Sequence, residues 1–333
     1  VEGDGGGRCR IQQKNKFCVG DTIEVMKPDG RNLELTVAGM EDEEGNPSQM
    51  NDGKYPTGRK LTIKEGMTRS LNTVSAQLLK TLTPQVSFNF LTQQLGFKLV
   101  DSRTNEDGTV QSDIDLAPLA LGALTDGVTV REMAGGFSTF INDGVCGGTR
   151  TYTKVTDSEG NTVMENTPNT DKGFTNVRTD YYMLDCLQNV TAHGTAYGIQ
   201  LDGVETGGKT GTTTSNTDIW FCGITPKYSG AVWVGYEHNY RLDGLYGRNA
   251  ANIWLAVMQK VHAGDSGLVF DSHPQDFEEV TYCMDTGLLA SGACRAAGRA
   301  ATGRFWKGKV PTETCSHQNI ENKYDFESMG VDN

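Results

Sequence analysis

The chain contains Thr206-Gly-Gly-Lys-Thr-Gly-Thr-Thr213, Ile219-Trp-Phe-Cys-Gly-Ile224 and Gly230-Ala-Val-Trp-Val-Gly-Tyr236, three short segments in close succession. β-Branched and aromatic residues dominate the second and third segments, and such residues favour strands. The connections between the segments are short, and strands joined by tight turns run antiparallel. This stretch therefore predicts a three-stranded antiparallel meander.

Helical patterns lie on both sides of the predicted meander. Residues 62–80 carry apolar side chains near the 3.6-residue spacing of an amphipathic helix. Further helices are predicted over residues 86–95, 116–124, 130–142, 179–191 and 248–262, and a hairpin over residues 151–163. Helices before and after an antiparallel sheet indicate a mixed α/β (α+β) fold in which helices layer on the sheet.

Composition and charge limit the classes of function. The 333 residues are 36% hydrophobic, which is enough for a globular core. The formal net charge is −12 and the basic residues are scattered, so a nucleic-acid-binding surface is disfavoured. No segment approaches the ~18 apolar residues of a membrane span, and residues 1–7 show no signal-peptide pattern. For the chain as given, these features predict a cytoplasmic location.

Residues 1–50 predict a small all-β segment that differs from the rest of the chain. Thr22-Ile-Glu-Val-Met26 and Leu33-Glu-Leu-Thr-Val37 alternate apolar and polar residues, as half-buried strands do. The acidic, turn-rich stretch Glu41-Asp-Glu-Glu-Gly-Asn-Pro47 then indicates a boundary. We therefore expect three regions, over residues 1–50, 51–265 and 266–333, the last of them loop-rich with a disordered end.

The cysteines indicate a disulfide bond near the C-terminus. None of the eight forms a C-x-x-C pair, so neither a metal site nor a cofactor is expected. Cys283 and Cys294 bracket ten residues in a stretch with little core-forming sequence. A disulfide between them would contribute about 3 kcal/mol in the chain-entropy model and would fit an oxidising, extracytoplasmic compartment. Reduced thiols in a cytosolic protein are the alternative.

Two short motifs carry candidate chemistry. Lys209-Thr-Gly-Thr-Thr213 combines a cation with hydroxyl groups that can hold a carboxylate, and its backbone N–H groups can form part of an oxyanion hole. Ser70-Leu-Asn72 lies within the helical pattern, where residues two apart do not share a face. Ser70 and Asn72 would both face a cleft only if the helix breaks there. Taken singly, each motif is better explained without function: Lys209-Thr-Gly211 as an exposed strand edge, and Ser70 with Asn72 as a helix-cap pair.

Together and in this order, the motifs resemble the transpeptidase domain of penicillin-binding proteins, serine acyltransferases related to the serine β-lactamases. The resemblance covers residues from about 51 to about 317. Leu61-Thr-Ile-Lys-Glu-Gly-Met-Thr-Arg-Ser-Leu-Asn-Thr-Val74 resembles the segment around the family's S-x-N motif, and Lys209-Thr-Gly211 its K-T-G motif. The blocks look most like the class A type of Gram-positive bacteria. The resemblance implies a penicillin-binding protein/serine β-lactamase-like transpeptidase fold, here N-terminally incomplete.

The resemblance also implies a reaction and a location. In this family a serine attacks the D-alanyl-D-alanine carbonyl of a peptidoglycan stem peptide and forms an acyl-enzyme. The amine of a neighbouring peptide resolves the acyl-enzyme and makes a cross-link, and β-lactams acylate the same serine. The parent family acts outside the cytoplasm and is membrane-anchored.

The motifs assign roles by position. Ser70 would relay protons to the leaving amine, Asn72 would bind the substrate amide, and Lys209 would set the electrostatics around them. The residues expected to bind the substrate carboxylate are Thr210, Gly211 and Thr212, and the Thr212 N–H would be half of the oxyanion hole.

The family's nucleophile motif, S-x-x-K, has no counterpart in this sequence. No serine is followed by a lysine at the third position, and the nearest pair, Ser75 and Lys80, lies five apart. A domain of this kind would be unable to acylate. The alternative is a non-catalytic module that binds stem peptides or cell-wall partners.

Residues 1–50 resemble a different family. Arg8-Cys-Arg-Ile-Gln-Gln-Lys-Asn-Lys-Phe-Cys-Val-Gly-Asp-Thr-Ile-Glu-Val-Met26 looks like the C-terminal β-barrel segment of collagenase-like U-family peptidases, which act in the cytoplasm. We therefore expect a junction near residues 49–52, from gene truncation or rearrangement. Two alternatives are a genuine accessory module and the remnant of a cytoplasmic peptidase.

Overall fold

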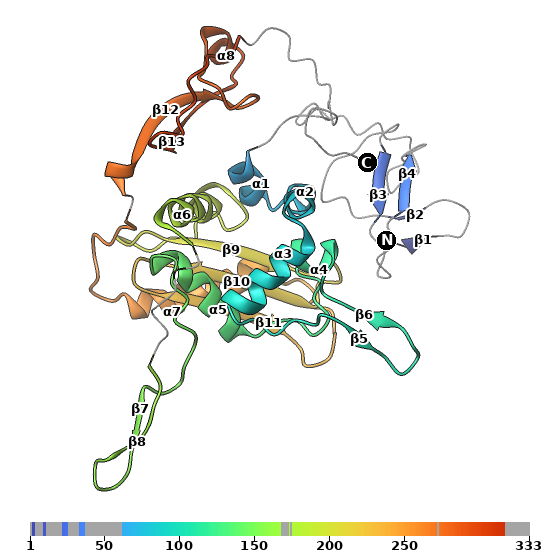
Figure 1. Cartoon of the computed structure of the whole chain (residues 1–333), viewed down its shortest axis with the longest axis vertical. Coiled ribbons are helices and arrows are strands. Elements are labelled where there is room, and N and C mark those ends of the chain that lie inside the picture. Colours follow the sequence, from blue (N-terminus) through green and yellow to red (C-terminus); the bar gives the residue numbers. More distant parts are fainter. Residues whose placement is uncertain are drawn as a thin grey trace. The chain divides into compact units, whose positions relative to one another are not determined.

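The computed structural model describes residues 62–167, 173, 175–271 and 273–316, together with four short strands before residue 37 (Figure 1). The chain divides into two compact units, one of residues 63–70 and 74–273, and one of residues 1–62, 71–73 and 274–333. We call the first the sheet unit and residues 274–316 the C-terminal segment. The predicted boundary at 41–47, the junction at 49–52 and the chain end beyond 316 lie outside the described residues.

The four N-terminal strands form two antiparallel pairs. Strand β1 (Glu2–Gly3) pairs with β2 (Cys9–Arg10), and β3 (Thr22–Val25) pairs with β4 (Leu33–Thr36). The strands predicted at 22–26 and 33–37 are therefore confirmed to within one residue. The regions predicted at 1–50, 51–265 and 266–333 stay predictions.

The sheet unit is built on the predicted meander. Strands β9 (Gly207–Thr212), β10 (Asp218–Ile224) and β11 (Ser229–Gly235) form an antiparallel sheet in the order β11-β10-β9. The register places Lys209 opposite Cys222, at the centre of the β9–β10 ladder. Among the described strands, β9 pairs with β10 alone and therefore forms one edge of this sheet.

Glycines on the strands allow a tryptophan to lie directly on the sheet. Trp254, in helix α7 (Gly247–Val261), is buried and packs edge-to-face on Phe221 at 5.4 Å between ring centroids. A Cβ added at Gly223 would lie 2.5 Å from Trp254 Cε2, and one at Gly230 would lie 2.9 Å from its Nε1. A larger residue at either position would push the indole off the sheet.

Helices cover both faces of the sheet (Figure 1), and each layer packs apolar side chains against it. Phe221 of β10 packs with Trp254, whereas Ile224 packs with Leu184 and Leu187 of helix α6 (Val177–His193). Successive strand residues point to opposite faces. Residues 221 and 224 are three apart and therefore contact the helices on opposite faces of the sheet. This is the α+β architecture that the sequence predicts.

The remaining elements of the sheet unit follow most of the predicted ranges with bounds that differ by a few residues, and they add a hairpin at residues 103–111 that was not predicted. The helices are α1 (Ile63–Arg69), α2 (Asn72–Leu82), α3 (Pro84–Asn89), the π-helix η1 (Phe90–Gln94), α4 (Leu116–Leu121), α5 (Val130–Ser138) and the 3₁₀ helix η2 (Thr139–Ile141). The hairpins are β5 (Arg103–Thr104) with β6 (Val110–Gln111), and β7 (Lys154–Thr156) with β8 (Thr162–Glu165). Helix α4 ends at Leu121, and not at residue 124, because Gly122 takes a left-handed conformation at φ +79° and caps it.

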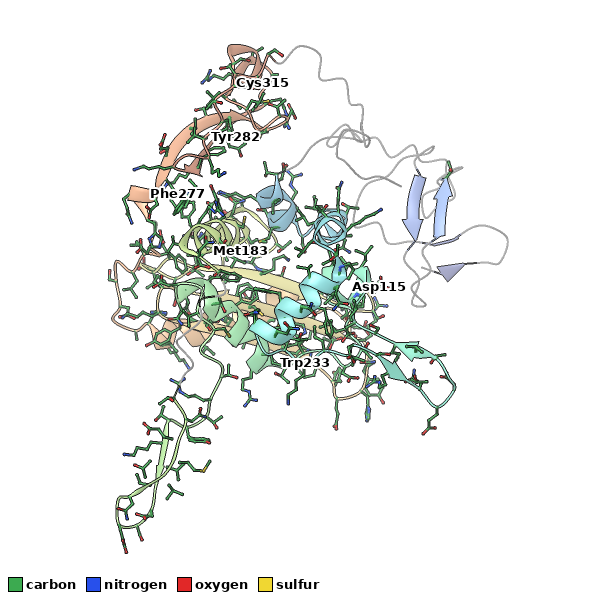
Figure 2. All side chains as sticks on the ribbon, in the orientation of Figure 1. Asp115, Met183, Trp233, Phe277, Tyr282 and Cys315 are labelled. Atoms are coloured by element: carbon green, nitrogen blue, oxygen red, sulfur yellow. The ribbon has the colours of Figure 1, made fainter. Side chains whose placement is uncertain are left out.

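The C-terminal segment is more regular than its composition indicates. After the 3₁₀ turn η3 (Pro274–Asp276), strand β12 (Phe277–Cys283) pairs antiparallel with β13 (Ala300–Trp306), and the short helix α8 (Gly292–Ala296) lies between them in sequence. Figure 2 labels Phe277 and Tyr282 on β12. This regular structure was not predicted, because the Gly- and Ala-rich residues between the strands conceal the strand pattern.

No helix among the described residues is long and apolar enough to cross a membrane.

Candidate functional site

The S-x-N motif marks a break between two helices. Ser70 lies between the end of α1 and the start of α2, with φ +56°. Its N–H donates to Met67 O at 3.1 Å, which closes the last turn of α1. Positive φ is unusual for a residue other than glycine and indicates a position held by its surroundings. The predicted break is confirmed, and it turns the Ser70 side chain out of the helical repeat.

A short polar network fixes α1 against the end of α6. Thr68 is buried, and its Oγ1 accepts from Asn189 Nδ2 at 2.6 Å and donates to Lys64 O at 2.6 Å. Thr195 N–H donates to Thr68 O at 3.2 Å. A Cβ added at Gly194 would lie 2.3 Å from Thr68 O, so only glycine permits this approach. The network places Ser70, two residues after Thr68, beside strand β9.

Lys209 and Ser70 are in direct contact. Lys209 Nζ donates to Ser70 Oγ at 2.8 Å and to Thr210 O at 2.8 Å. Burial lowers the Lys209 pKa from its usual value to about 8. Across the ladder, burial raises the pKa of the Cys222 thiol to about 12, against the opposing effect of Lys209. At neutral pH the site therefore holds a largely protonated lysine beside an uncharged thiol.

The threonines of β9 continue the site along the strand. Thr210 Oγ1 lies 2.7 Å from Thr195 Oγ1. A Cβ added at Gly247 would lie 3.1 Å from Thr210 Cβ and 3.4 Å from Thr212 Oγ1, so the start of α7 fits closely against both side chains. Thr212 is exposed at the end of the strand. The hydroxyl groups and the ammonium group thus gather on one strand at the edge of the sheet.

Similarity to known proteins identifies the family of this chain. The pattern of the penicillin binding protein transpeptidase domain matches residues 35–259. The chain belongs to the penicillin-binding protein transpeptidase family. Two further families match other parts of the chain. The peptidase family U32 C-terminal domain matches residues 1–64, which overlap the transpeptidase match at residues 35–64. The penicillin-binding protein 1A C-terminal domain matches residues 273–319.

Curated relatives agree with this family. The chain is 32% identical over 259 residues to penicillin-binding protein 1A of Clostridium botulinum, covering 76% of this chain and 30% of that protein. It is 30% identical over 217 residues to penicillin-binding protein 4 of Bacillus subtilis, covering 65% of this chain and 32% of that protein. The chain therefore spans about a third of the length of these relatives.

Solved structures support the fold. Penicillin-binding protein 1A from Haemophilus influenzae matches with a TM-score of 0.62 at 19% identity, over 89% of this chain and 45% of that one. PonA1 from Mycobacterium tuberculosis matches with a TM-score of 0.56 at 23% identity, over 76% of this chain and 65% of that one. The predicted transpeptidase fold is confirmed.

The structure brings some of the predicted site residues together, whereas the roles of the others stay predictions. Ser70, Lys209 and Thr210 are brought together by direct contacts or adjacency. Asn72 begins α2, and its role toward the substrate amide stays a prediction. Thr195 was not predicted as a site residue, because a threonine after a helix-ending glycine carries no signal of its own. The roles proposed for Gly211 and Thr212 also stay predictions.

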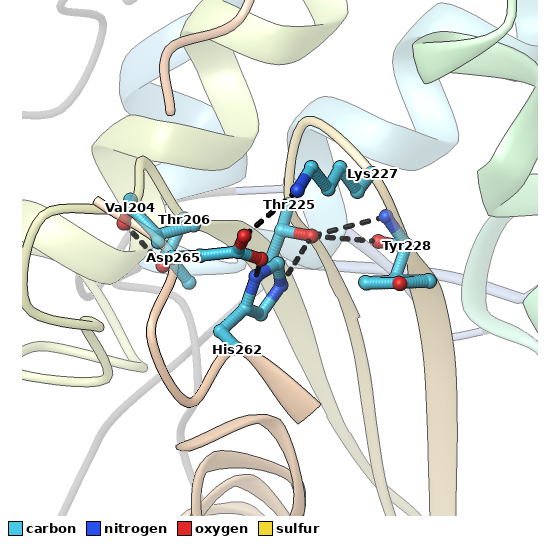
Figure 3. Close-up of polar contacts among 7 residues, drawn as sticks. All are labelled: Val204, Thr206, Thr225, Lys227, Tyr228, His262 and Asp265. Carbon is cyan, nitrogen blue, oxygen red and sulfur yellow. Dashed lines mark hydrogen bonds and ion pairs between the residues drawn. The ribbon is translucent and has the colours of Figure 1, made fainter. Parts of the chain in front are cut away.

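A second polar cluster resembles a nucleophile–histidine–carboxylate arrangement (Figure 3). His262 Nε2 lies 3.0 Å from Thr225 Oγ1, and His262 Nδ1 lies 2.8 Å from Asp265 Oδ2. Thr225 is fully buried, so no substrate can reach its hydroxyl group. Thr225 Oγ1 also accepts from Tyr228 N–H at 3.0 Å. The cluster therefore holds the β10–β11 turn against the end of α7 and is structural.

A pocket of about 460 Å³ lies elsewhere on the sheet unit, beside the loop that leads into β9. Its lining includes Gln188, Glu205 and Leu268, and none of the motif residues. Lys209 and its neighbours instead lie on an edge strand of the sheet, which suits an extended peptide better than an enclosed small molecule.

Proposed function

We propose that this transpeptidase domain recognises the terminal carboxylate of a D-alanyl-D-alanine stem peptide, without forming an acyl-enzyme through residues 1–333. The observation that carries the proposal is the 2.8 Å hydrogen bond from Lys209 Nζ to Ser70 Oγ. It joins two family motifs that lie far apart in sequence. β-Lactams, which carry a similarly placed carboxylate, are proposed as ligands of the same site.

The charge and hydroxyl groups of β9 favour an anionic ligand. Lys209 supplies an ammonium group whose pKa of about 8 keeps it largely charged at pH 7. Hydrogen bonds between an ammonium group and a carboxylate are roughly twice as strong as neutral ones. Thr210 and Thr212 add hydroxyl groups on the same strand. A carboxylate bound here would gain from all three side chains.

The position of β9 favours a peptide. Because β9 is an edge strand among the described residues, its outer backbone groups can pair with an extended chain. Such pairing aligns a stem peptide along the strand and delivers its C-terminus to Lys209. Backbone bonds would supply affinity, and the ammonium group would supply selectivity for a free carboxylate.

The absent S-x-x-K motif is the reason to propose recognition without acylation. In the family a lysine one helical turn after the serine removes its proton, and this sequence offers no such pair. Ser70 is the serine nearest to a base in the described site, and we assign it the relay position because it occupies the S-x-N motif.

Calorimetry with diacetyl-L-Lys-D-Ala-D-Ala tests the proposal. We expect weak binding, with Kd on the order of 1 mM, and none for the same peptide with a C-terminal amide. The Lys209→Met variant should lose the binding. Lys227→Met is the matched control, because Lys227 is an exposed lysine that pairs with Asp265 outside the site. Equal binding of the acid and the amide, or unchanged binding by Lys209→Met, would contradict the proposal.

A further inference from the structure

The C-terminal segment has a small core with two parts. Phe277 is buried and packs edge-to-face on Trp306 at 5.3 Å between ring centroids. The second part is a buried cluster of Cys283, Ala290, Cys294 and Cys315, with Leu288 and Ala300 packed against it. Domains of about 40 residues rarely bury enough apolar surface to fold alone, and they usually depend on disulfides or metals. In the second part of this core, most of the buried residues are themselves cysteines.

The three thiols converge from separate parts of the segment. Their Sγ atoms all lie within 4.8 Å of one another, and the side chains are 0%, 0% and 2% exposed for Cys283, Cys294 and Cys315. Cys283 ends strand β12, Cys294 lies in α8, and Cys315 follows the bridge between Leu289 and Thr314. Figure 2 labels Cys315 in this segment.

Backbone hydrogen bonds fix the three cysteines around one loop. Cys283 N–H donates to Leu288 O at 2.7 Å, and Cys315 N–H donates to Leu289 O at 2.9 Å. Cys294 O accepts from Arg299 N–H at 2.8 Å. Main-chain hydrogen bonds therefore hold all three cysteines in place.

We propose that Cys283, Cys294 and Cys315 bind one zinc ion. Tetrahedral zinc holds thiolates at about 2.3 Å, which places the sulfur atoms roughly 3.8 Å apart. The three Sγ atoms all lie within 4.8 Å of one another, so at most about 1 Å separates any pair from this value. Each thiol would release its proton to solvent on binding, and a water molecule or a further donor would complete four-coordination.

The convergence of three thiols within 4.8 Å of one another is what favours zinc over a disulfide. A disulfide joins two sulfur atoms and leaves the third buried with no covalent role, whereas a thiophilic ion uses all three. The predicted pairing of Cys283 with Cys294 stays a prediction and is the competing account. Zinc binding would also explain a buried cluster made largely of cysteines in so short a segment.

Metal analysis of the full chain tests the proposal. We expect about one zinc per chain after purification under reducing conditions with added zinc, because structural sites bind tightly. The Cys294→Ala variant should hold less than a tenth of that amount. Cys186→Ala is the matched control, since Cys186 is a buried cysteine of α6 in the sheet unit, and it should retain the metal.

Cobalt substitution supplies a readout that does not depend on a variant folding. Cobalt(II) in place of zinc should give thiolate-to-metal charge-transfer bands and the intense visible bands of a tetrahedral site. Cys294→His should keep the visible bands with a weaker charge-transfer band. Full zinc content in Cys294→Ala, no zinc in the wild-type chain, or a chain mass 2 Da lower with a Cys283–Cys294 crosslink would overturn the proposal.

Discussion

The sheet unit and the C-terminal segment are stabilised in different ways. In the sheet unit, buried aromatic and aliphatic side chains on both faces of three strands form the core, with Phe221 and Trp254 in contact at its centre. In the C-terminal segment the buried side chains are Phe277, three cysteines and one alanine. Hydrophobic burial is the main source of stability in the first unit, whereas under the zinc proposal the second gains stability from its sulfur atoms.

The same comparison separates function from stability. The site residues of the sheet unit lie at a strand edge, outside the apolar core that supports them. In the C-terminal segment, the reactive groups are cysteine thiols that are themselves buried. Changes at Lys209 should therefore alter binding with little effect on folding, while changes at the cysteines should alter folding first.

Metal removal should have the largest effect and should be confined to one region. If zinc holds the C-terminal segment, chelation removes on the order of 10 kcal/mol of binding free energy, and the segment unfolds. Hydrogen exchange of β12 and β13 should become fast, with β9 to β11 unchanged. Slow exchange of β12 and β13 in excess chelator would show that the two regions are stabilised in the same way.

Truncation of Trp254 should have the next largest effect, this time in the sheet unit. Trp254→Ala should lower the free energy of unfolding by about 3–5 kcal/mol, because it leaves a cavity on the sheet. Ile253→Ala is the control, since Ile253 is 48% exposed on the same helix. Urea unfolding followed by circular dichroism measures both. Similar losses for the two variants would contradict the assignment of the core.

Loss of the Thr225 hydroxyl should destabilise the sheet unit to a smaller degree. Thr225→Val leaves Tyr228 N–H and a ring nitrogen of His262 without their partner, at a cost of about 1–3 kcal/mol. The exposed Thr81, whose hydroxyl donates to Gln77 O, provides a control as Thr81→Val. Equal urea midpoints for Thr225→Val and the wild-type chain would show that the buried cluster contributes nothing.

The smallest predicted effect is the pH dependence of ligand binding. Burial lowers the Lys209 pKa to about 8, so the charged form predominates below this pH and is lost above it. Affinity for the D-Ala-D-Ala peptide should fall roughly tenfold between pH 7 and pH 9, since the protonated fraction falls by that factor. Lys209→Arg should show a flat profile in the same calorimetric titration. If the affinity of the wild-type chain did not change with pH, the Lys209 ammonium group would not be a ligand of the peptide carboxylate.

Local patterns in the sequence predicted much of this molecule. The alternation and tight turns of residues 206–236 predicted the meander, and the face argument at Ser70 and Asn72 predicted the helix break. Both depend on residues close together in the chain, where periodicity carries the information. The contact of Ser70 with Lys209 could be expected only from the family resemblance, because it spans 139 positions.

The features that the sequence did not predict depend on distant contacts. Thr68, Asn189 and Thr195 form the network behind Ser70, yet each is an ordinary polar residue in its own segment. The convergence of Cys315 on Cys283 and Cys294 depends on the pairing of β12 with β13 and on the bridge at Leu289. Spacing in sequence cannot reveal such a meeting, so only the pair nearest in sequence was predicted.

Intact-protein mass spectrometry after incubation with a penicillin distinguishes recognition of the ligand from acylation. We expect the denatured chain to keep its original mass, because the site recognises a carboxylate and holds no S-x-x-K nucleophile in residues 1–333. A mass increase equal to that of the penicillin, lost in the Ser70→Ala variant, would contradict this expectation. It would show that Ser70 is acylated with Lys209 as its base.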